Sequence, residues 1–331
     1  FFHCLVNAAH QFHIHENNDD RYILAGYPWF KCRARDTFIA LPGLTLSIEE
    51  QSYFALVMKT AQKGLDEFMQ GKPLSVKIYE MEQPDVPLWA IWCLQQYAKE
   101  AGMQKCLDMY GPFMKRILTF IERGDPNLKV MDNALVYTNG TDKAVTWMNS
   151  TVNGKPVIPR TGYIVEFNAL WYNALKFCAS IALLAKKNKD AEHLEKLAER
   201  CRKSFLDTFM NEYGYLFDYV GGNDRDWSVR PNMIFAVALD YSPLEQDQKK
   251  SVLDVCTREL LTPKGLRSLS PKSGGYNPMY VGPQTQRDYA YHQGTAWPWL
   301  GGFYMEACLK LYKRTRLSFI ERQMVGYEDE M

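Results

Sequence analysis

Residues 106–121, with the sequence CLDMYGPFMKRILTFI, decide the fold class because their apolar positions recur at spacings of three and four. That spacing places the apolar side chains on one face of an α-helix. We count about ten segments of this kind, whereas the alternation typical of strands is confined to residues 134–138 and 213–220. The pattern predicts an all-α domain. Further segments with the helical period lie at residues 54–68, 194–209 and 297–311.

Length and composition describe a large globular chain. The 331 residues are 47% hydrophobic and 23% charged, and we expect a single domain over residues 1–331. No run approaches the roughly 18 apolar residues of a membrane-spanning helix. Thirty-nine basic and 38 acidic side chains give a formal charge of +1. Nucleic acid and anionic membranes are therefore not expected as partners.

The cysteines and histidines give no sign of a disulfide framework or a cofactor. Eight cysteines are scattered without a C-x-x-C pair, mostly within apolar stripes, which is typical of reduced, buried thiols in a cytoplasmic protein. Four of the six histidines lie in the first 15 residues. A zinc site there would need a fourth ligand, so we favour a polar helix face that continues into a loop, and we expect no metal. Neither a P-loop nor a G-x-G-x-x-G motif is present, and no cofactor is expected.

Three long segments between the predicted helices are rich in Trp, Tyr, Arg and Asp: residues 22–35, 134–164 and 272–296. Loops of this length within a compact domain are usually functional. Helix pairs whose connecting loops converge on one rim would form an α/α toroid. The aromatic content of 14% is then explained by two sets of residues, in the helix cores and on the rim.

Three motif regions, in order along the chain, resemble the amylo-α-1,6-glucosidase domain of bacterial glycogen debranching enzymes. The first is AGYPWFKCRARDTFIALPGL at residues 25–44. The second is TWMNS at 146–150 with VEFNALWYNAL at 165–175, and the third is LTPKGLRSLSP at 261–271 with DYAYHQGTAWPW at 288–299. The resemblance implies an (α/α)6 barrel of the six-hairpin, glucoamylase-like type. It also implies hydrolysis of α-1,6-linked glucose at the branch stubs of glycogen or a branched α-glucan, with inversion.

Arg35 and Asp36 are the predicted contacts to the terminal glucose. A carboxylate can accept hydrogen bonds from two hydroxyls, and a guanidinium donates to others in a fixed geometry. The alternative is that Asp36, which immediately precedes a predicted helix, only caps its amide groups. The match of residues 25–44 to the family favours glucose binding.

Aromatic side chains in the same loops are predicted to form walls of the sugar site, because sugars present apolar C–H faces as well as hydroxyls. The alternative for each of them is an ordinary place in the core, which we expect for the helical Trp89, Trp92 and Trp171. The candidates for the site are Tyr27, Trp29, Trp147, Tyr291, His292, Gln293, Trp297 and Trp299.

The general acid is the first difficulty for the hydrolysis that the resemblance implies. The family pattern places it at the Asp of Thr-Trp-Met-Asp, and this chain has Asn149 there. An amide cannot donate a catalytic proton as a carboxylic acid does. Glu166 is the first substitute, although a carboxylate at a helix N-terminus is favourable without any catalytic role. Lesser candidates are Asp85, Asp142 and Asp288.

The general base is the second difficulty. The family places it in a Ser-Glu-Ile-Phe-Asp-Gly-like stretch near the C-terminus, and nothing similar follows Trp299. We therefore expect a fragment of a longer protein, without the base, the last barrel helices and an N-terminal sugar-binding domain. Two functions remain open, namely a glycoside hydrolase domain and a non-catalytic glucan-binding module that keeps the glucose subsite.

Overall fold

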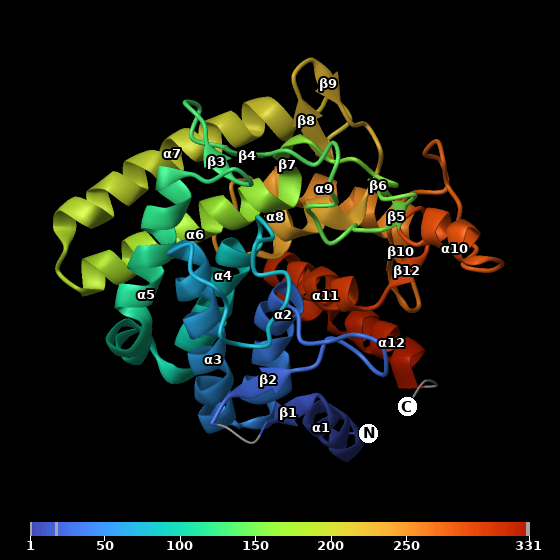
Figure 1. The fold of residues 1–331 in the computed structure, drawn as a ribbon. Coiled ribbons are helices and arrows are strands. Elements are labelled where there is room, and N and C mark those ends of the chain that lie inside the picture. The colour runs from blue at the N-terminus through green and yellow to red at the C-terminus, as the bar shows by residue number, and fades with distance from the viewer. Residues whose placement is uncertain (1, 17–18, 329–331) are drawn as a thin grey trace. The chain divides into compact units, whose positions relative to one another are not determined.

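The computed structural model describes residues 2–16 and 19–328 and is mainly helical, as the sequence predicts (Figure 1). The chain divides into two compact units. Unit 1 comprises Phe1–Lys129 and Phe177–Leu194, and unit 2 comprises Val130–Lys176 and Glu195–Met331.

Unit 1 is built around four helices, in which α2 packs against α3 and α4, and α5 packs against the same two helices (Figure 1). The apolar stripe of α5 is buried through Cys106, Tyr110, Phe113 and Ile117, which confirms the predicted helix. Its partners follow the same period, so each helix hides one face against the others. The elements are α1 (Phe2–Gln11), β1 (His13–His15), β2 (Arg21–Ile23), α2 (Ala34–Thr45), η1 (Leu46–Ile48), α3 (Gln51–Met69), α4 (Val86–Ala101) and α5 (Met103–Arg123).

Two long helices, α6 (Val165–Leu184) and α7 (Asn188–Phe209), form a hairpin that passes through both units. Within unit 2, Lys176 of α6 forms an ion pair with Glu195 of α7. The apolar period predicted at residues 194–209 is confirmed by the buried side chains of Leu194, Cys201 and Phe209.

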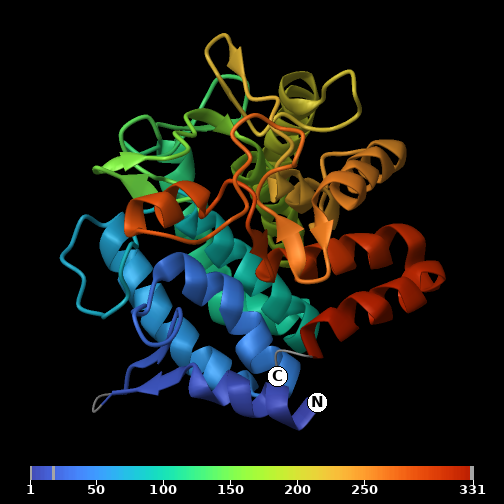
Figure 2. The same cartoon turned by 90° about the vertical axis from the view of Figure 1, so that its right-hand side faces the viewer.

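The remaining helices belong to unit 2. Helix α11 packs against α8 and α9, and η3 turns the chain so that α12 returns beside α11 (Figure 2). The helix predicted at residues 297–311 begins at Trp299, because Trp297 belongs to a strand. These elements are η2 (Pro231–Met233), α8 (Ile234–Ala238), α9 (Gln246–Leu260), α10 (Gln284–Ala290), α11 (Trp299–Tyr312), η3 (Lys313–Arg316) and α12 (Leu317–Glu328).

Short strands connect the helices and carry the long loops. The two predicted strand segments supply β4 and β8 but are shorter than predicted. The largest sheet has the order β3-β4-β7-β8-β9, β10-β11-β12 form a three-stranded sheet, and β1 pairs with β2 and β5 with β6. The strands are β3 (Lys129–Val130), β4 (Val136–Thr138), β5 (Thr151–Val152), β6 (Lys155–Pro156), β7 (Gly162–Ile164), β8 (Tyr219–Gly221), β9 (Asp224–Arg225), β10 (Leu261–Thr262), β11 (Gly265–Arg267) and β12 (Ala296–Trp297).

Gly162 sets the distance between β7 and β8. Its φ is +108°, and a Cβ at this position would lie 2.2 Å from the carbonyl oxygen of Val220 on β8. Tyr163 pairs with Val220 in the antiparallel register. No side chain fits at residue 162 without moving one strand away from the other.

The eight cysteines are all unpaired, and six of them are buried, which confirms the predicted burial of most of the thiols. Among the described residues, no helix is both long and apolar enough to cross a membrane. The described part of the chain also contains no group of three or more His, Cys, Asp or Glu placed to hold a metal ion. Of the N-terminal histidines, His10 hydrogen-bonds to Glu50, and the ring of His13 bonds to the carbonyl oxygen of Leu44.

Thiol labelling of the native chain should show about one fast-reacting cysteine. Cys4 is exposed, whereas burial raises the pKa of the half-buried Cys32 to about 11 and that of Cys106 to about 12. Since the thiolate is the reactive form, the buried thiols react slowly. Ellman's reagent at pH 8 measures this, with all eight thiols reacting after denaturation. Rapid reaction of several thiols in the folded chain would contradict the observed burial.

Candidate active site

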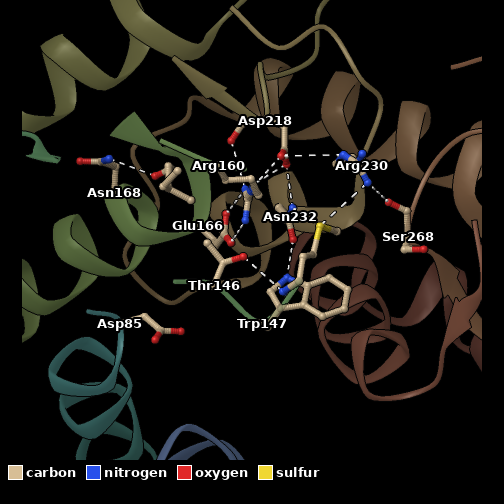
Figure 3. A network of polar contacts seen from close by, with 12 residues as sticks. Asp85, Thr146, Trp147, Arg160, Glu166, Asn168, Asp218, Arg230, Asn232 and Ser268 are labelled. Carbon is tan, nitrogen blue, oxygen red and sulfur yellow. Dashed lines mark hydrogen bonds and ion pairs between the residues drawn. The ribbon is translucent and has the colours of Figure 1, made fainter. Parts of the chain in front are cut away.

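Arg160 is the centre of a buried ionic network in unit 2 (Figure 3). Its guanidinium donates to both carboxylate oxygens of Glu166, with Nη2 2.7 Å from Oε2. Its Nε lies 2.7 Å from Oδ2 of Asp218. Glu166 stands in the first turn of α6, and Asp218 directly precedes β8. One guanidinium therefore joins the start of a helix to the start of a strand.

Asn232 connects this network to Trp147. Its Nδ2 donates to Oδ1 of Asp218 at 2.7 Å, and its Oδ1 accepts from Nε1 of Trp147 at 2.6 Å. Pro231 supplies the first residue of η2, where its fixed φ suits a helical turn and its missing N–H is no loss. The orientation of the indole is thus fixed by a hydrogen-bonded chain that ends at a buried carboxylate.

Arg230 fixes the loop before α11 to the same network. Its Nη1 donates to the carbonyl oxygens of Ser268 at 3.1 Å and His292 at 2.9 Å. Its Nη2 donates to Oε1 of Gln293 at 2.8 Å, and its Nε lies 4.0 Å from Oδ2 of Asp218. Because the guanidinium is a rigid fork of donors, it sets the relative position of the segments that it contacts.

The network contains two guanidiniums, of Arg160 and Arg230, and two carboxylates, of Glu166 and Asp218. Burial raises the pKa values of Glu166 and Asp218, while the positive charge of Arg160 opposes both shifts. Burial also lowers the pKa of Arg230, against the attraction of Asp218. Two carboxylates and two guanidiniums together make a set that can be buried, whereas a single member left without its partners would be costly.

Trp147 is also the centre of an aromatic cluster. Its ring centroid lies 5.3 Å from those of His292, Trp297 and Trp299, each in an edge-to-face arrangement. His292 stacks on Trp297 at 5.0 Å and 8°, and Tyr291 contacts both rings. Offset and edge-to-face pairs at such separations are favourable. The structure therefore brings together the wall residues that the sequence predicted in unit 2, with Gln293 attached to them through Arg230.

Asn149 lies half-buried between two anchored neighbours. The Sδ of Met148 accepts from Nδ2 of Asn232 at 3.6 Å, and the Oγ of Ser150 donates to the carbonyl oxygen of Asp288 at 2.6 Å. The position that carries the acid in the family pattern is thus held in a defined place, with an amide in it.

The other acid candidates are committed elsewhere or lie at the surface. A catalytic acid must carry a proton and reach the glycosidic oxygen. Glu166 is 1% exposed and has both carboxylate oxygens bound by Arg160, so this geometry supports a structural role for it. Asp142 is exposed, and the carboxylate of Asp288 accepts from Gln284 within α10.

In unit 1, Arg35 and Asp36 have different surroundings. Nε and Nη2 of Arg35 donate to the two oxygens of Asp85 at 2.6 and 2.8 Å, and Nε1 of Trp89 donates to the same carboxylate at 3.1 Å. This buried fork joins the start of α2 to the start of α4. Asp36 is half-buried and takes part in no ion pair among the described residues. Burial raises its pKa, against the charges of Arg35 and Arg33.

The expectation that Asp36 immediately precedes a helix is wrong. Helix α2 begins at Ala34 with Arg33 as its N-cap, so Asp36 lies inside the first turn, and no side chain caps this helix. The apolar face that starts with Ala34 and Phe38 is already buried, which extends the helix toward its N-terminus. The two predicted wall residues of unit 1 lie at the surface, with Trp29 82% exposed and Tyr27 56% exposed.

Sequence reasoning missed the partners of the network. Arg160 and Arg230 each sit beside a proline, which offered only a weak signal. Asp218 had no local signal, because its role depends on contact with Arg160, which lies 58 residues away in the chain. A charged side chain predicted to be fully buried would have been the only indication.

Solved structures define the class of the fold as that of the six-hairpin glycosidases. A bacterial glucoamylase complexed with acarbose has a TM-score of 0.57 at 17% identity, covering 89% of this chain and 43% of that chain. A GH63 mannosylglycerate hydrolase from Thermus thermophilus in complex with glucose has a TM-score of 0.66 at 12% identity, covering 97% and 90%. The predicted all-α, six-hairpin fold class is thereby confirmed.

Sequence comparison gives the family. The model of the amylo-alpha-1,6-glucosidase family matches residues 7–329, and the chain belongs to this family. The glycogen debranching enzyme of Saccharomyces cerevisiae (strain ATCC 204508 / S288c) is 24% identical over 249 residues, which are 60% of this chain and 16% of that protein. The chain thus spans about a sixth of the length of this relative.

Proposed function

We propose that this chain binds the terminal glucose of an α-1,6-linked branch on glycogen or a related α-glucan and acts in its hydrolysis with inversion. One observation carries the proposal. In a chain of this family, the rings of Trp147, His292 and Trp297 come from two separate motifs and contact one another, and Trp147 is hydrogen-bonded to the buried polar network. Aromatic faces complement the C–H faces of a sugar, and fixed polar groups complement its hydroxyls. The unpaired cysteines support the reducing, cytoplasmic location that we propose with it.

Asn149 limits this reaction. Inversion requires a general acid and a general base about 6.5–9.5 Å apart, with a water between the base and the sugar. An amide at the acid position and an ion-paired Glu166 leave neither residue able to donate the proton. The same observation favours a second function, that of a non-catalytic glucan-binding module.

Release of glucose distinguishes the two functions. Panose and isomaltose would be incubated with the 331-residue chain, and glucose would be followed by proton NMR. Slow release of β-glucose is expected for an inverting hydrolase. Binding of both sugars without any release of glucose would establish the binding module, and the absence of binding would contradict both functions.

Replacing Asp36 by alanine should weaken acarbose binding about 10- to 100-fold, because a hydrogen bond from a hydroxyl to a carboxylate contributes about 1.5–3 kcal/mol. The thermal midpoint should change little, since Asp36 forms no ion pair among the described residues. Isothermal titration calorimetry and a thermal scan measure the two effects. Asp207→Ala removes an exposed carboxylate from α7 and serves as the matched control. Unchanged acarbose affinity of the Asp36 variant would remove this residue from the glucose site.

A further inference from the structure

Unit 2 contains a cavity of about 630 Å³ that is separate from the Trp147 cluster in its lining residues. Its walls come from the loop around β8 and β9, the end of α9 and the segment at residues 270–274. Two of its aromatic side chains are open to solvent, with Tyr213 69% exposed and Trp227 44% exposed. Nothing in the proposed reaction uses these residues.

The aromatic wall of the cavity is held in place by its own packing. The ring of Trp227 stands edge to face on Phe217 at 4.6 Å and 89°, and the ring of Tyr213 lies 5.9 Å from it. The hydroxyl of Tyr215 donates to the carbonyl oxygen of Trp227 at 2.9 Å. The hydrogen bond from Tyr215 holds the backbone of Trp227, and Phe217 holds its ring. The half-exposed indole is therefore a preorganised flat surface for a ligand.

The opposite wall is polar, and one carboxylate in it, that of Glu259, is shared by two cations. The carboxylate of Glu259 accepts from Nζ of Lys272 at 2.7 Å, from Nε of Arg258 at 3.0 Å and from Oγ of Ser270 at 3.2 Å. Since both cations share this carboxylate, the wall offers N–H and O–H donors together with carboxylate acceptors, which suits a ligand rich in hydroxyls. Flat aromatic groups on one side and hydrogen-bonding groups on the other are the requirements of a sugar.

The cavity shares a piece of chain with the candidate active site. Val229 lines the cavity, and the next residue, Arg230, anchors the network around Asp218. The backbone of Val229 is fixed by Ser270, whose N–H donates to its carbonyl oxygen at 3.0 Å, and by Oγ of Ser273 at 3.3 Å. A ligand bound here lies against the same loop that positions the site.

We propose that this cavity is a second carbohydrate site, which binds a linear segment of the α-glucan chain rather than the glucose at the branch. The proposal rests on the proposed function for the class of sugar. It adds the part of the substrate that is recognised and the residues that recognise it, chiefly Trp227 and Tyr213.

The test compares a long and a short ligand on the same chain. Trp227→Ala and Tyr213→Ala should each bind maltoheptaose about tenfold more weakly, as expected for loss of one stacked ring, while acarbose affinity stays within about twofold. Trp227→Phe, which keeps a flat ring, should restore most of the maltoheptaose affinity. Tyr312→Ala removes a partly exposed ring from the end of α11, outside the cavity, and is the matched control. Tyr213→Ala is informative even if the tryptophan variant folds poorly, because Tyr213 is largely exposed.

Each outcome decides between the two proposals. If the wild-type chain binds maltoheptaose and both alanine variants bind it equally well, the second site is contradicted and the proposed function stands. If the wild-type chain binds neither sugar, both proposals fail. If inorganic phosphate binds and Lys272→Ala abolishes that binding while maltoheptaose has no effect, the cavity is an anion site and the inference is overturned.

Discussion

Replacing Arg160 by alanine is expected to destabilise the protein by about 3–5 kcal/mol, the cost of leaving a buried charge without its partner. Arg160 is 1% exposed, and its guanidinium is shared by Glu166 and Asp218. Its removal leaves two buried carboxylates side by side, with Arg230 4.0 Å from one of them. The free energy of unfolding would be measured by urea denaturation, and a loss of less than about 1 kcal/mol would contradict the network as described.

The pH dependence of this variant gives an independent check. Burial already raises the pKa values of Glu166 and Asp218, and loss of Arg160 removes an attraction that opposes this rise. The folded variant then binds protons more tightly than the unfolded chain, so its stability falls as pH rises above the usual carboxylate pKa of about 4. The deficit relative to wild type should therefore be larger at pH 8 than at pH 5.

Arg202→Ala is the matched control for the loss of a guanidinium. Arg202 forms an ion pair with Glu245, whose side chain is 70% exposed. Exposed pairs of this kind contribute about 0–1 kcal/mol, so the control should stay close to wild type. Equal losses for the two arginine variants would mean that the buried ion pairs of Arg160 contribute no more to stability than an exposed one.

Replacing Asn149 by aspartate should raise the rate of glucose release by about 10²–10⁴, the usual contribution of general acid catalysis. Aspartate has nearly the shape of asparagine, and the backbone here is held through Met148 and Ser150, so the new carboxyl group takes the place of the amide. The rate would be measured with panose, with the wild-type chain and the variant in parallel. Affinity for acarbose should change far less than the rate.

Asn153→Asp provides the control for the change in charge. Asn153 is exposed in the turn between β5 and β6, with φ of +51°, which aspartate tolerates about as well as asparagine. A gain in rate confined to residue 149 identifies it as the position of the acid. If wild type releases glucose rapidly and the Asn149 variant is no faster, another group supplies the proton.

The helices could be predicted because the apolar residues of each buried face recur at helical spacing in the local sequence, as at Cys106, Phe113 and Ile117. The start of α2 was misplaced by only a few residues, since the apolar face continues to Ala34. The strands were harder to predict, because a segment of two or three residues is too short for its alternating pattern to show where the strand begins and ends. Their pairing depends on residues far apart, as between Tyr163 and Val220.

The clustering of aromatic side chains was predictable where residue type alone was informative. Trp147 and His292 belong to the long segments predicted between helices, Trp297 directly follows one of them, and the structure places the three rings in one cluster. The roles of the charged residues were not accessible in this way. Whether Glu166 is an acid or an ion-pair partner depends on the direction of Arg160, which is set by tertiary contacts that no local pattern records.

Gly162 gives the network an unusual sensitivity. Arg160 lies two residues before it, and Asp218 lies two residues before Val220, the residue that a Cβ at position 162 would strike. An added Cβ at residue 162 would therefore push β8 away from β7. This shift would change the positions of Arg160 and Asp218 relative to each other. The alignment of the ionic network is thus constrained by a position whose requirement is the absence of a side chain.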